Sequence, residues 1–255
     1  MSHELIALPA FSDNYIWALR SGDHALVVDP GDPAVVRQWL SQNRLQLDVI
    51  LITHHHADHT GGLLPLLNSH NAQVFGPDEN IQGLTHVLSG GDTLELGVFG
   101  NLTVLPVPGH TLGHIAYYLP EQELLFAGDT LFSAGCGRLF EGTAAQMYAS
   151  LQSLAALPDS TRLCCAHEYT VSNLRFAAAV EPGNPAVTRR QHEVEALRAA
   201  GKPSLPVTLG LERGYNPFLR CHIPAVAQAA SLQGNTPPDT TESTFAALRA
   251  WKDRF

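Results

Sequence analysis

The stretch that decides the fold is Thr53-His54-His55-His56-Ala57-Asp58-His59. Just before it, residues 47–52 (Leu-Asp-Val-Ile-Leu-Ile) are mostly leucine or β-branched, which predicts a buried strand. Just after it, Gly61-Gly62 and a leucine-rich run predict the start of a helix. The histidine-rich segment is therefore expected on a loop between a strand and a helix, at the end of a sheet where open α/β folds bind their ligands.

The spacing within this loop predicts ligands for metal ions. Side chains two residues apart in an extended segment share a side, so His54 and His56 can converge on one cation while His55 points away. Asp58 and His59 project from a later part of the loop and could hold a second cation. Imidazole with carboxylate suits zinc or a similar metal. The alternative is a histidine-rich surface loop that chelates metal only by accident.

Three more expected loops each offer one ligand directly after a predicted strand: His110 in Pro-Gly-His-Thr, Asp129 in Gly-Asp-Thr and His167 in Ala-His-Glu. A single histidine at a strand end is more often structural, but together these residues complete two sites. His54, His56 and His110 would form one site, and Asp58, His59 and His167 would form the other. Asp129 could bridge both metals, which leaves room for a shared water and indicates a catalytic centre.

Composition limits the class of protein. The chain has 255 residues, 45% of them hydrophobic and 15% charged, as expected for a globular protein with an ample core. Its formal net charge of −9 argues against a nucleic-acid-binding surface. We expect no membrane span and no signal peptide. The four cysteines do not resemble a disulfide framework, so we expect a cytoplasmic protein.

The order of predicted elements indicates two domains. Strand-like segments, among them residues 25–29, dominate up to residue 166 and are interrupted by helices expected at 33–40 and 143–157. Asp32 is the candidate N-cap of the first helix, with Pro33 at its first position. From residue 169 onward strands nearly vanish, and helical patterns cover residues 173–200, 225–232 and 244–252. We therefore expect a catalytic domain over residues 1–169 and a mainly helical domain over residues 170–255.

The motifs His-His-His-Ala-Asp-His, Pro-Gly-His-Thr-Leu-Gly-His, Gly-Asp-Thr-Leu-Phe and Cys-Ala-His-Glu-Tyr-Thr resemble, in this order and spacing, those of the metallo-β-lactamase superfamily. Gly-Cys-Gly-Arg-Leu-Phe-Glu-Gly-Thr at 135–143 and the C-terminal Leu-Arg-Ala-Trp-Lys-Asp-Arg-Phe narrow the resemblance to the glyoxalase II family of hydroxyacylglutathione hydrolases. The resemblance implies a four-layer αββα sandwich of the α/β (α+β) class with a binuclear site between two sheets, followed by a helical domain. Periodicity alone could not reveal the two packed sheets.

The same resemblance implies a glutathione thioester as substrate, chiefly S-D-lactoylglutathione, cleaved to glutathione and D-lactate in the second step of methylglyoxal detoxification. Arg138 and Tyr169 match family positions that contact the tripeptide. Arg249 and Lys252 lie one helical turn apart and could meet the glycine carboxylate, although such a pair is also typical of a solvated helical face. Phe140 stands where some relatives carry tyrosine, so one hydroxyl contact is missing, although the ring could still pack on the substrate.

The expected mechanism uses two divalent cations, with zinc favoured and iron or manganese compatible. A hydroxide that bridges the metals, held through Asp58 and Asp129, would attack the thioester carbonyl carbon, and one metal would stabilise the oxyanion. The thiolate would then leave without a protein nucleophile. We expect a monomer with a small-molecule substrate and neither nucleic-acid nor membrane partners.

Three alternatives stay open at this stage. A mononuclear-iron persulfide dioxygenase could use the same fold, but its tail would be short or absent. A nuclease of the superfamily is disfavoured by the acidic balance. A non-enzymatic metal-storage module would need neither an open coordination position nor the cation pair in the tail.

Overall fold

A computed structural model of the chain describes residues 3–233 and 239–255. The chain divides into two compact units, each with its own internal packing. One consists of Met1–Pro106, Gly113–Gly128 and Cys164–His167, and the other of Val107–Leu112, Asp129–Leu163 and Glu168–Phe255. Within the described ranges, no helix is both long enough and apolar enough to cross a bilayer.

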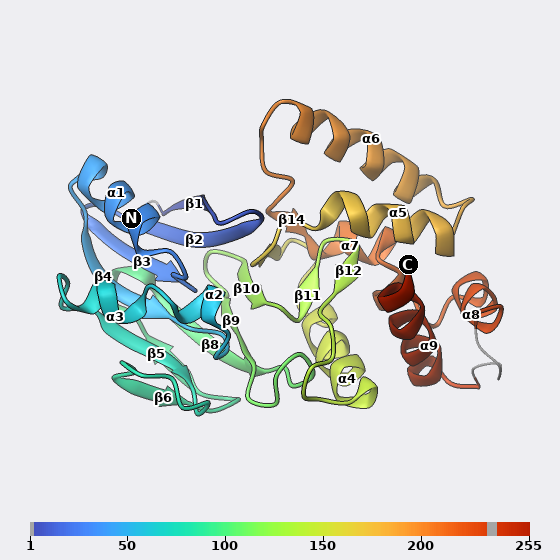
Figure 1. Ribbon diagram of the computed structural model, residues 1–255, viewed down its shortest axis with the longest axis horizontal. Coiled ribbons are helices and arrows are strands. Elements are labelled where there is room, and N and C mark those ends of the chain that lie inside the picture. The colour runs from blue at the N-terminus through green and yellow to red at the C-terminus, as the bar shows by residue number, and fades with distance from the viewer. Residues whose placement is uncertain (1–2, 234–238) are drawn as a thin grey trace. The chain divides into compact units, whose positions relative to one another are not determined.

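The first sheet lies wholly in the first unit and follows chain order from β1 to β6 (Figure 1). Its strands are β1 (Glu4–Ala10), β2 (Asn14–Ser21), β3 (His24–Val28), β4 (Gln46–Leu51), β5 (Gln73–Pro77) and β6 (His86–Leu88). The first three strands pair antiparallel, and β3 to β6 pair parallel. The ends of parallel strands gather at one edge, which puts the loop after β4 where a binding site is expected.

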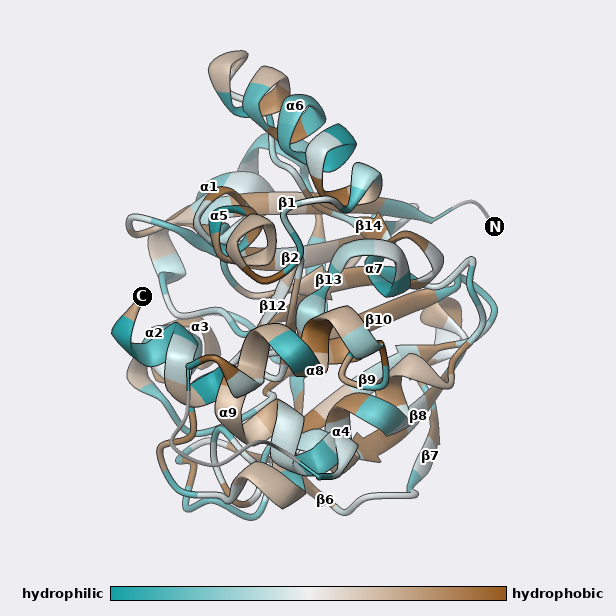
Figure 2. Cartoon of the chain, turned by 90° about the vertical axis from the view of Figure 1, so that its right-hand side faces the viewer, coloured by the Kyte–Doolittle hydropathy of each residue, from teal (hydrophilic) through white to brown (hydrophobic). Residues whose placement is uncertain are grey.

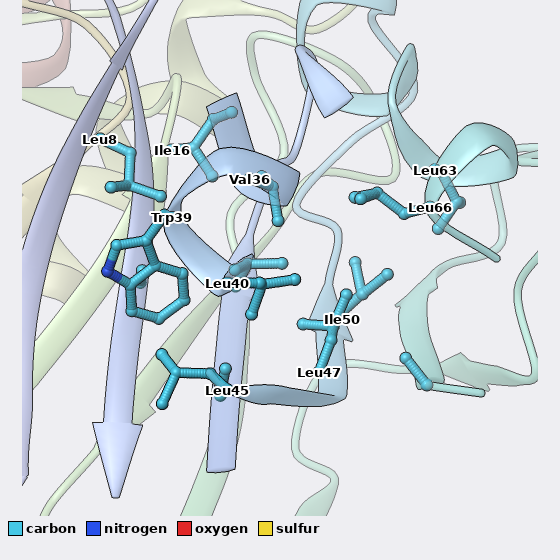
Figure 3. Packing of buried hydrophobic residues seen from close by; sticks show 14 of the residues in the cluster. Leu8, Ile16, Val36, Trp39, Leu40, Leu45, Leu47, Ile50, Leu63 and Leu66 are labelled. Carbon is cyan, nitrogen blue, oxygen red and sulfur yellow. The ribbon is translucent and has the colours of Figure 1, made fainter. Parts of the chain in front are cut away.

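Helix α1 (Pro33–Asn43) packs on this sheet because one of its faces is apolar. It begins as predicted: the side chain of Asp32 accepts a hydrogen bond from the Ala34 N–H, and Pro33 occupies the first turn. Trp39 and Leu40 are buried in a cluster with residues of the strands (Figure 3). The short helices α2 (Ala57–Thr60) and α3 (Leu63–Leu67) follow the histidine-rich loop, and leucines of α3 join the same cluster.

The second sheet has the order β14-β13-β10-β9-β8-β7. Its strands are β7 (Thr93–Glu95), β8 (Asn101–Pro106), β9 (Ile115–Leu119), β10 (Leu124–Gly128), β13 (Arg162–Cys165) and β14 (Val207–Thr208), with the 3-10 turn η1 (Gly97–Phe99) before β8. Within the first unit, the hydroxyl of Tyr117 on β9 donates to the carbonyl oxygen of Ile52 at 2.6 Å, and Nε1 of Trp17 on β2 donates to that of Cys165 at 2.9 Å. These bonds join the two sheets, which periodicity could not place together.

The second unit is mainly helical. It contains α4 (Ala144–Ala155), α5 (Thr170–Val180), α6 (Pro185–Ala199), α7 (Leu209–Tyr215), η2 (Pro217–Leu219), α8 (Pro224–Ser231), α9 (Thr241–Arg254) and the hairpin β11 (Leu131–Phe132) and β12 (Gly135–Cys136). Leucine, valine and alanine side chains from α5 and α6 form part of its core. Figure 2 shows the mainly hydrophobic strands β8 to β10 and the many hydrophilic residues along α6.

The structure refines several predicted elements. The helical stretch expected over 173–200 is two helices, because Pro182 and Gly183 interrupt it and Asn184 caps a new helix with Pro185 in its first turn. The strands β6, β11, β12 and β14 and helix α7 have no counterpart among the predictions. The four strands span only two or three residues each, too few to show a period of two.

Candidate metal centre and substrate cavity

The histidine-rich loop is anchored by the carboxylate of Asp29, which directly follows β3 and has a left-handed backbone (φ +52°). Its Oδ1 accepts a hydrogen bond from the Thr53 N–H at 2.8 Å, and its Oδ2 accepts one from Thr53 Oγ1 at 2.7 Å. Oδ2 also lies 3.0 Å from Nδ1 of His59. The ends of two adjacent strands are thus tied together, and the His59 ring is fixed in orientation.

Asp58, His59 and His167 come together in the first unit. Oδ2 of Asp58 lies 3.3 Å from Nε2 of His59 and 3.5 Å from Nε2 of His167. Nδ1 of His167 lies 2.9 Å from Oδ1 of Asp13. One ligand atom from each of the three residues lies within 4.8 Å of the others, close enough to hold one metal ion. Both histidines therefore have Nδ1 on a carboxylate and Nε2 facing the shared oxygen of Asp58.

The surroundings of Asp58 favour its ionised form. A hydrogen bond with His59 lowers the pKa of the carboxyl well below its usual range, although partial burial works in the opposite direction. A hydrogen bond from Nδ2 of Asn14 at 2.9 Å and the charges of His59 and His167 lower the pKa further. A carboxylate in this form is a ready metal ligand.

His54 and His56 converge as the spacing predicts. Nε2 of His54 lies 3.1 Å from Nδ1 of His56, and the buried His54 ring stacks on His114 with centroids 4.6 Å apart. The side chain of His55 instead contacts Glu79, with Nδ1 3.0 Å from Oε2. Two ring nitrogens of the first unit are thus close enough to share a cation.

His110 and Asp129 form a buried pair in the second unit. Nε2 of His110 lies 3.4 Å from Oδ2 of Asp129, and Nδ1 lies 2.9 Å from the carbonyl oxygen of Arg138. Because a carbonyl oxygen can only accept, the proton of this ring belongs on Nδ1, and Nε2 can serve as a ligand. Gly137 allows this packing, since a Cβ there would lie 1.9 Å from the backbone oxygen of Asp129.

The donor set fits divalent cations. His59, His110 and His167 each place Nδ1 on an oxygen and direct Nε2 at a carboxylate, the arrangement that orients metal-binding histidines. Imidazole and carboxylate donors are compatible with zinc, iron or manganese. The geometry therefore agrees with a centre for divalent metal ions.

A cavity of about 590 Å³ lies in the second unit. It is lined by His110, Asp129, Phe132, Cys136, Arg138, Phe140, Tyr169, Ser172, Asn173, Arg249, Lys252, Asp253 and Phe255. All five residues expected to contact the substrate line this cavity, together with two of the expected metal ligands. The cavity is therefore the candidate substrate site.

Arg249 is more deeply embedded than a substrate-binding cation on an open helix face. Its side chain is buried, and Nη1 donates to the carbonyl oxygen of Cys136 at 2.9 Å while Nη2 donates to Oδ1 of Asp253 at 2.9 Å. Burial raises the pKa of the neighbouring Cys136 thiol, which disfavours the thiolate. Arg249 thus ties α9 to the β11–β12 hairpin, and Cys136 is a packing residue.

Lys252 is half-buried and more accessible. Its Nζ lies 5.2 Å from the centre of the Phe176 ring and 5.7 Å from that of Phe255, and it donates to the carbonyl oxygen of Ser172 at 3.4 Å. Burial, followed by the charge of Arg249, lowers the pKa of the Lys252 ammonium to about 8. This cation is therefore available to an anionic group in the cavity and titrates in an accessible pH range.

Phe140, Tyr169 and Arg138 present exposed side chains to the cavity. The Phe140 ring meets His110 edge-on with centroids 5.1 Å apart, and Tyr169 meets Phe132 edge-on at 5.3 Å. Arg138 lies 3.9 Å from Asp253, a weak ion pair that a substrate anion could replace.

Sequence reasoning did not identify the carboxylates that hold the histidines, namely Asp13, Asp29 and Glu79. Asp29 carried a usable signal, since it ends a predicted strand that would lie beside the one that leads into the metal loop. Asp13 and Glu79 carried none, because their partners lie far away in the sequence.

Comparisons with known proteins agree with this geometry. Residues 11–167 match the metallo-beta-lactamase superfamily, and residues 168–255 match the hydroxyacylglutathione hydrolase C-terminus. A hydroxyacylglutathione hydrolase of Albidiferax ferrireducens is 53% identical over 99% of this chain and 100% of its own length.

Two solved structures extend the comparison. The B3 metallo-beta-lactamase BLEG-1 has a TM-score of 0.64 at 23% identity, and the alignment covers 86% of this chain and 99% of that one. TTHA1623 in a di-iron-bound form has a TM-score of 0.55 at 27% identity, with 64% of this chain and 91% of that one covered. The predicted metallo-β-lactamase fold with a C-terminal helical part is thereby confirmed.

Proposed function

The chain belongs to the hydroxyacylglutathione hydrolase family of the metallo-beta-lactamase superfamily and is a hydrolase, and on that premise we propose that it cleaves the thioester of S-(2-hydroxyacyl)glutathione. S-D-lactoylglutathione is the proposed main substrate, with glutathione and D-lactate as products. This reaction would be the second step of methylglyoxal detoxification. Residues 1–169 would carry the catalytic centre, and residues 170–255 would contribute to glutathione recognition.

The proposed centre holds two divalent cations, zinc in the first instance. One cation would be held by His54, His56 and His110, the other by Asp58, His59 and His167, with Asp129 between them. When bound, such a pair lowers the pKa of water toward about 7 and polarises a carbonyl oxygen.

Chain connectivity supports the inclusion of His110 and Asp129. The loop with His110 leaves β8 at Pro106 and returns to β9 at Ile115, and both strands belong to the first unit. Asp129 follows Gly128 directly, so their Cα atoms are about 3.8 Å apart. A Cβ on Gly128 would lie 2.6 Å from Thr53 Oγ1 and 2.7 Å from the His114 ring. This connectivity supports the inclusion of Asp129 among the proposed ligands.

Side chains of the cavity would bind the rest of the substrate. Glutathione carries two carboxylates and one ammonium, and Lys252 and Arg138 offer the matching cations. Tyr169 would contact the tripeptide with its ring or hydroxyl. Arg249 would act mainly by holding α9 against the hairpin that carries Cys136, and so by setting the shape of the cavity.

One observation carries the proposal: a single cavity brings the His110–Asp129 pair together with the cations Arg138 and Lys252. A pair of side chains that can ligate a metal thus lines the same cavity as two cations that suit an anionic tripeptide. We further propose a monomer in the cytoplasm, where the buried thiols of all four cysteines would stay reduced.

Elemental analysis of the purified protein, together with hydrolysis of S-D-lactoylglutathione, tests the proposal. We expect two metal ions per chain, rapid hydrolysis, and loss of both metal and activity in the Asp129→Ala variant. An Asp129→Ala protein with two tightly held metals and full turnover would refute the bridging role. One iron per chain with oxygen uptake on a persulfide, and no thioester hydrolysis, would instead identify a dioxygenase.

A further inference from the structure

Glu79 is a nearly buried carboxylate that the proposed reaction does not yet use. It lies just after β5, and its side chain is only 7% exposed. Oε2 accepts a hydrogen bond from the backbone N–H of His55 at 2.9 Å and lies 3.0 Å from Nδ1 of the same residue. Oε1 accepts a hydrogen bond from the backbone N–H of Gly113 at 2.8 Å. One side chain therefore holds two separate segments of backbone.

Both segments belong to the candidate metal centre. His55 lies between His54 and His56, so the bond to its N–H fixes the backbone that directs both rings. Gly113 directly precedes His114, whose ring stacks on His54, and follows His110 by three residues. The two oxygens of Glu79 thus set the spacing between the histidine-rich loop and the segment that leads from His110.

Gly113 is needed for this contact. A Cβ at this position would lie 2.6 Å from Cγ and 2.8 Å from Oε1 of Glu79, closer than real side chains come. The missing side chain lets the carboxylate approach the backbone N–H. A substitution at Gly113 would consequently disturb the same link from the opposite side, without removing the carboxylate.

We propose that Glu79 is a positioning residue for the cation held by His54, His56 and His110, and not for the other cation. The inference rests on the proposed function, because it presupposes two cation sites. The second site has carboxylates of its own, since Asp29 and Asp13 hold His59 and His167. Glu79 instead accepts hydrogen bonds from His55 and Gly113, so the two sites should respond differently to its loss.

The Glu79→Gln variant tests whether Glu79 affects only one of the two proposed metal sites. Glutamine keeps the length of the side chain but replaces one acceptor oxygen with an NH₂ group, which cannot accept a hydrogen bond from an N–H. Either the His55 or the Gly113 N–H then loses its acceptor. Loss of a partner that orients ligands typically weakens metal binding about 10- to 100-fold.

The experiment titrates metal-free protein with Zn²⁺ against a chromophoric chelator and resolves two dissociation constants. We expect Glu79→Gln to weaken one of them about 10- to 100-fold and to leave the other unchanged. With S-D-lactoylglutathione, kcat should fall while KM stays near that of the wild type, because the cavity of the second unit is untouched. Gly113→Ala should reproduce this pattern.

Two further variants serve as controls. His55→Phe removes the contact between the imidazole ring and Glu79 but keeps the backbone N–H that donates to Glu79. We therefore expect only a small change in zinc affinity. Asp92→Asn changes a carboxylate that accepts one backbone N–H on an exposed turn, and both metal sites should stay intact.

The proposal is overturned if Glu79→Gln and Gly113→Ala bind both ions as tightly as the wild type. Equal weakening of both sites together with a lower Tm would also overturn it, because that pattern indicates a general structural role. Wild-type protein with one site would refute the inference and the binuclear centre alike. Two wild-type sites without thioester hydrolysis would refute the proposed function only, and the zinc titration would still decide the role of Glu79.

Discussion

Nδ1 of His59 lies 3.0 Å from Oδ2 of Asp29, and the same carboxylate accepts both hydrogen bonds that Thr53 donates. Both His59 and Asp29 are at least 95% buried, so their contact is shielded from bulk water. The contact joins the end of β3 to the loop after β4. It therefore fixes both the backbone of the metal loop and the ring orientation of one proposed ligand.

Asp29→Asn should weaken metal binding about 10- to 100-fold, since an amide NH₂ placed toward His59 or Thr53 cannot accept their hydrogen bonds. A buried donor without its partner should also lower the free energy of unfolding by about 1–3 kcal/mol. Chelator competition and thermal unfolding measure the two effects. Asp32→Asn makes the same change three residues away at an exposed N-cap, where asparagine serves as well, and should change neither quantity. Equal metal affinity in wild type and Asp29→Asn would contradict the prediction.

Replacement of Arg249 should lower the stability of the protein, whereas replacement of Lys252 should weaken substrate binding. Arg249→Ala leaves the carbonyl oxygen of Cys136 without its buried donor, so we expect a loss of about 1–3 kcal/mol in stability and a Tm lower by roughly 2–12 °C. Lys252→Met keeps much of the apolar stem of a half-buried side chain. It should raise KM for the thioester about 10-fold with little change in Tm. Differential scanning calorimetry and steady-state kinetics of the two variants test this contrast.

A reversed result would change the assignment of both residues. If Arg249→Ala were as stable as the wild type and only raised KM, the guanidinium would be a substrate ligand of the kind expected from the sequence. If Lys252→Met left KM unchanged, the ammonium would not meet a substrate anion.

Much of this structure was predictable because the informative residues are close in sequence. The His54–His59 spacing predicts ligand pairs within one loop, and the structure brings Asp58, His59 and His167 together. Asp32 and Pro33 predict the start of α1 correctly, since capping depends on neighbouring residues. The assignment of all seven residues as metal ligands stays a prediction, because it also depends on the bound metal ions.

Long-range relationships were not predictable. The distances from Asp13 to His167 and from Glu79 to Gly113 depend on how the strands are ordered, which periodicity does not encode. The role of Arg249 shows the same limit. Helical spacing places it one turn from Lys252, but only the packed structure shows that its guanidinium is occupied by Cys136 and Asp253.

The pH dependence of KM should report the Lys252 ammonium. Its pKa of about 8 means that the group is charged at pH 7 and mostly neutral at pH 9, so attraction to a substrate carboxylate is lost as the pH rises. KM of the wild type should therefore increase between pH 7 and pH 9, after correction for spontaneous thioester hydrolysis. Lys252→Met should lack this increase, and the difference between the two profiles removes the titration of the substrate itself. Parallel profiles would show that another group controls binding.

Phe140 offers a gain-of-affinity test in the same cavity. Phe140 is 63% exposed and its ring meets His110 edge-on, so a hydroxyl at the para position can enter the cavity without displacing a core residue. Phe140→Tyr should lower KM for S-D-lactoylglutathione about 2- to 10-fold, the value of one added hydrogen bond, and leave Tm unchanged. Phe140→Leu, which removes the ring but keeps an apolar side chain, should raise KM if the ring packs on the substrate. An unchanged KM in Phe140→Tyr would mean that the hydroxyl finds no partner on the bound thioester, and that phenylalanine costs this enzyme nothing at that position.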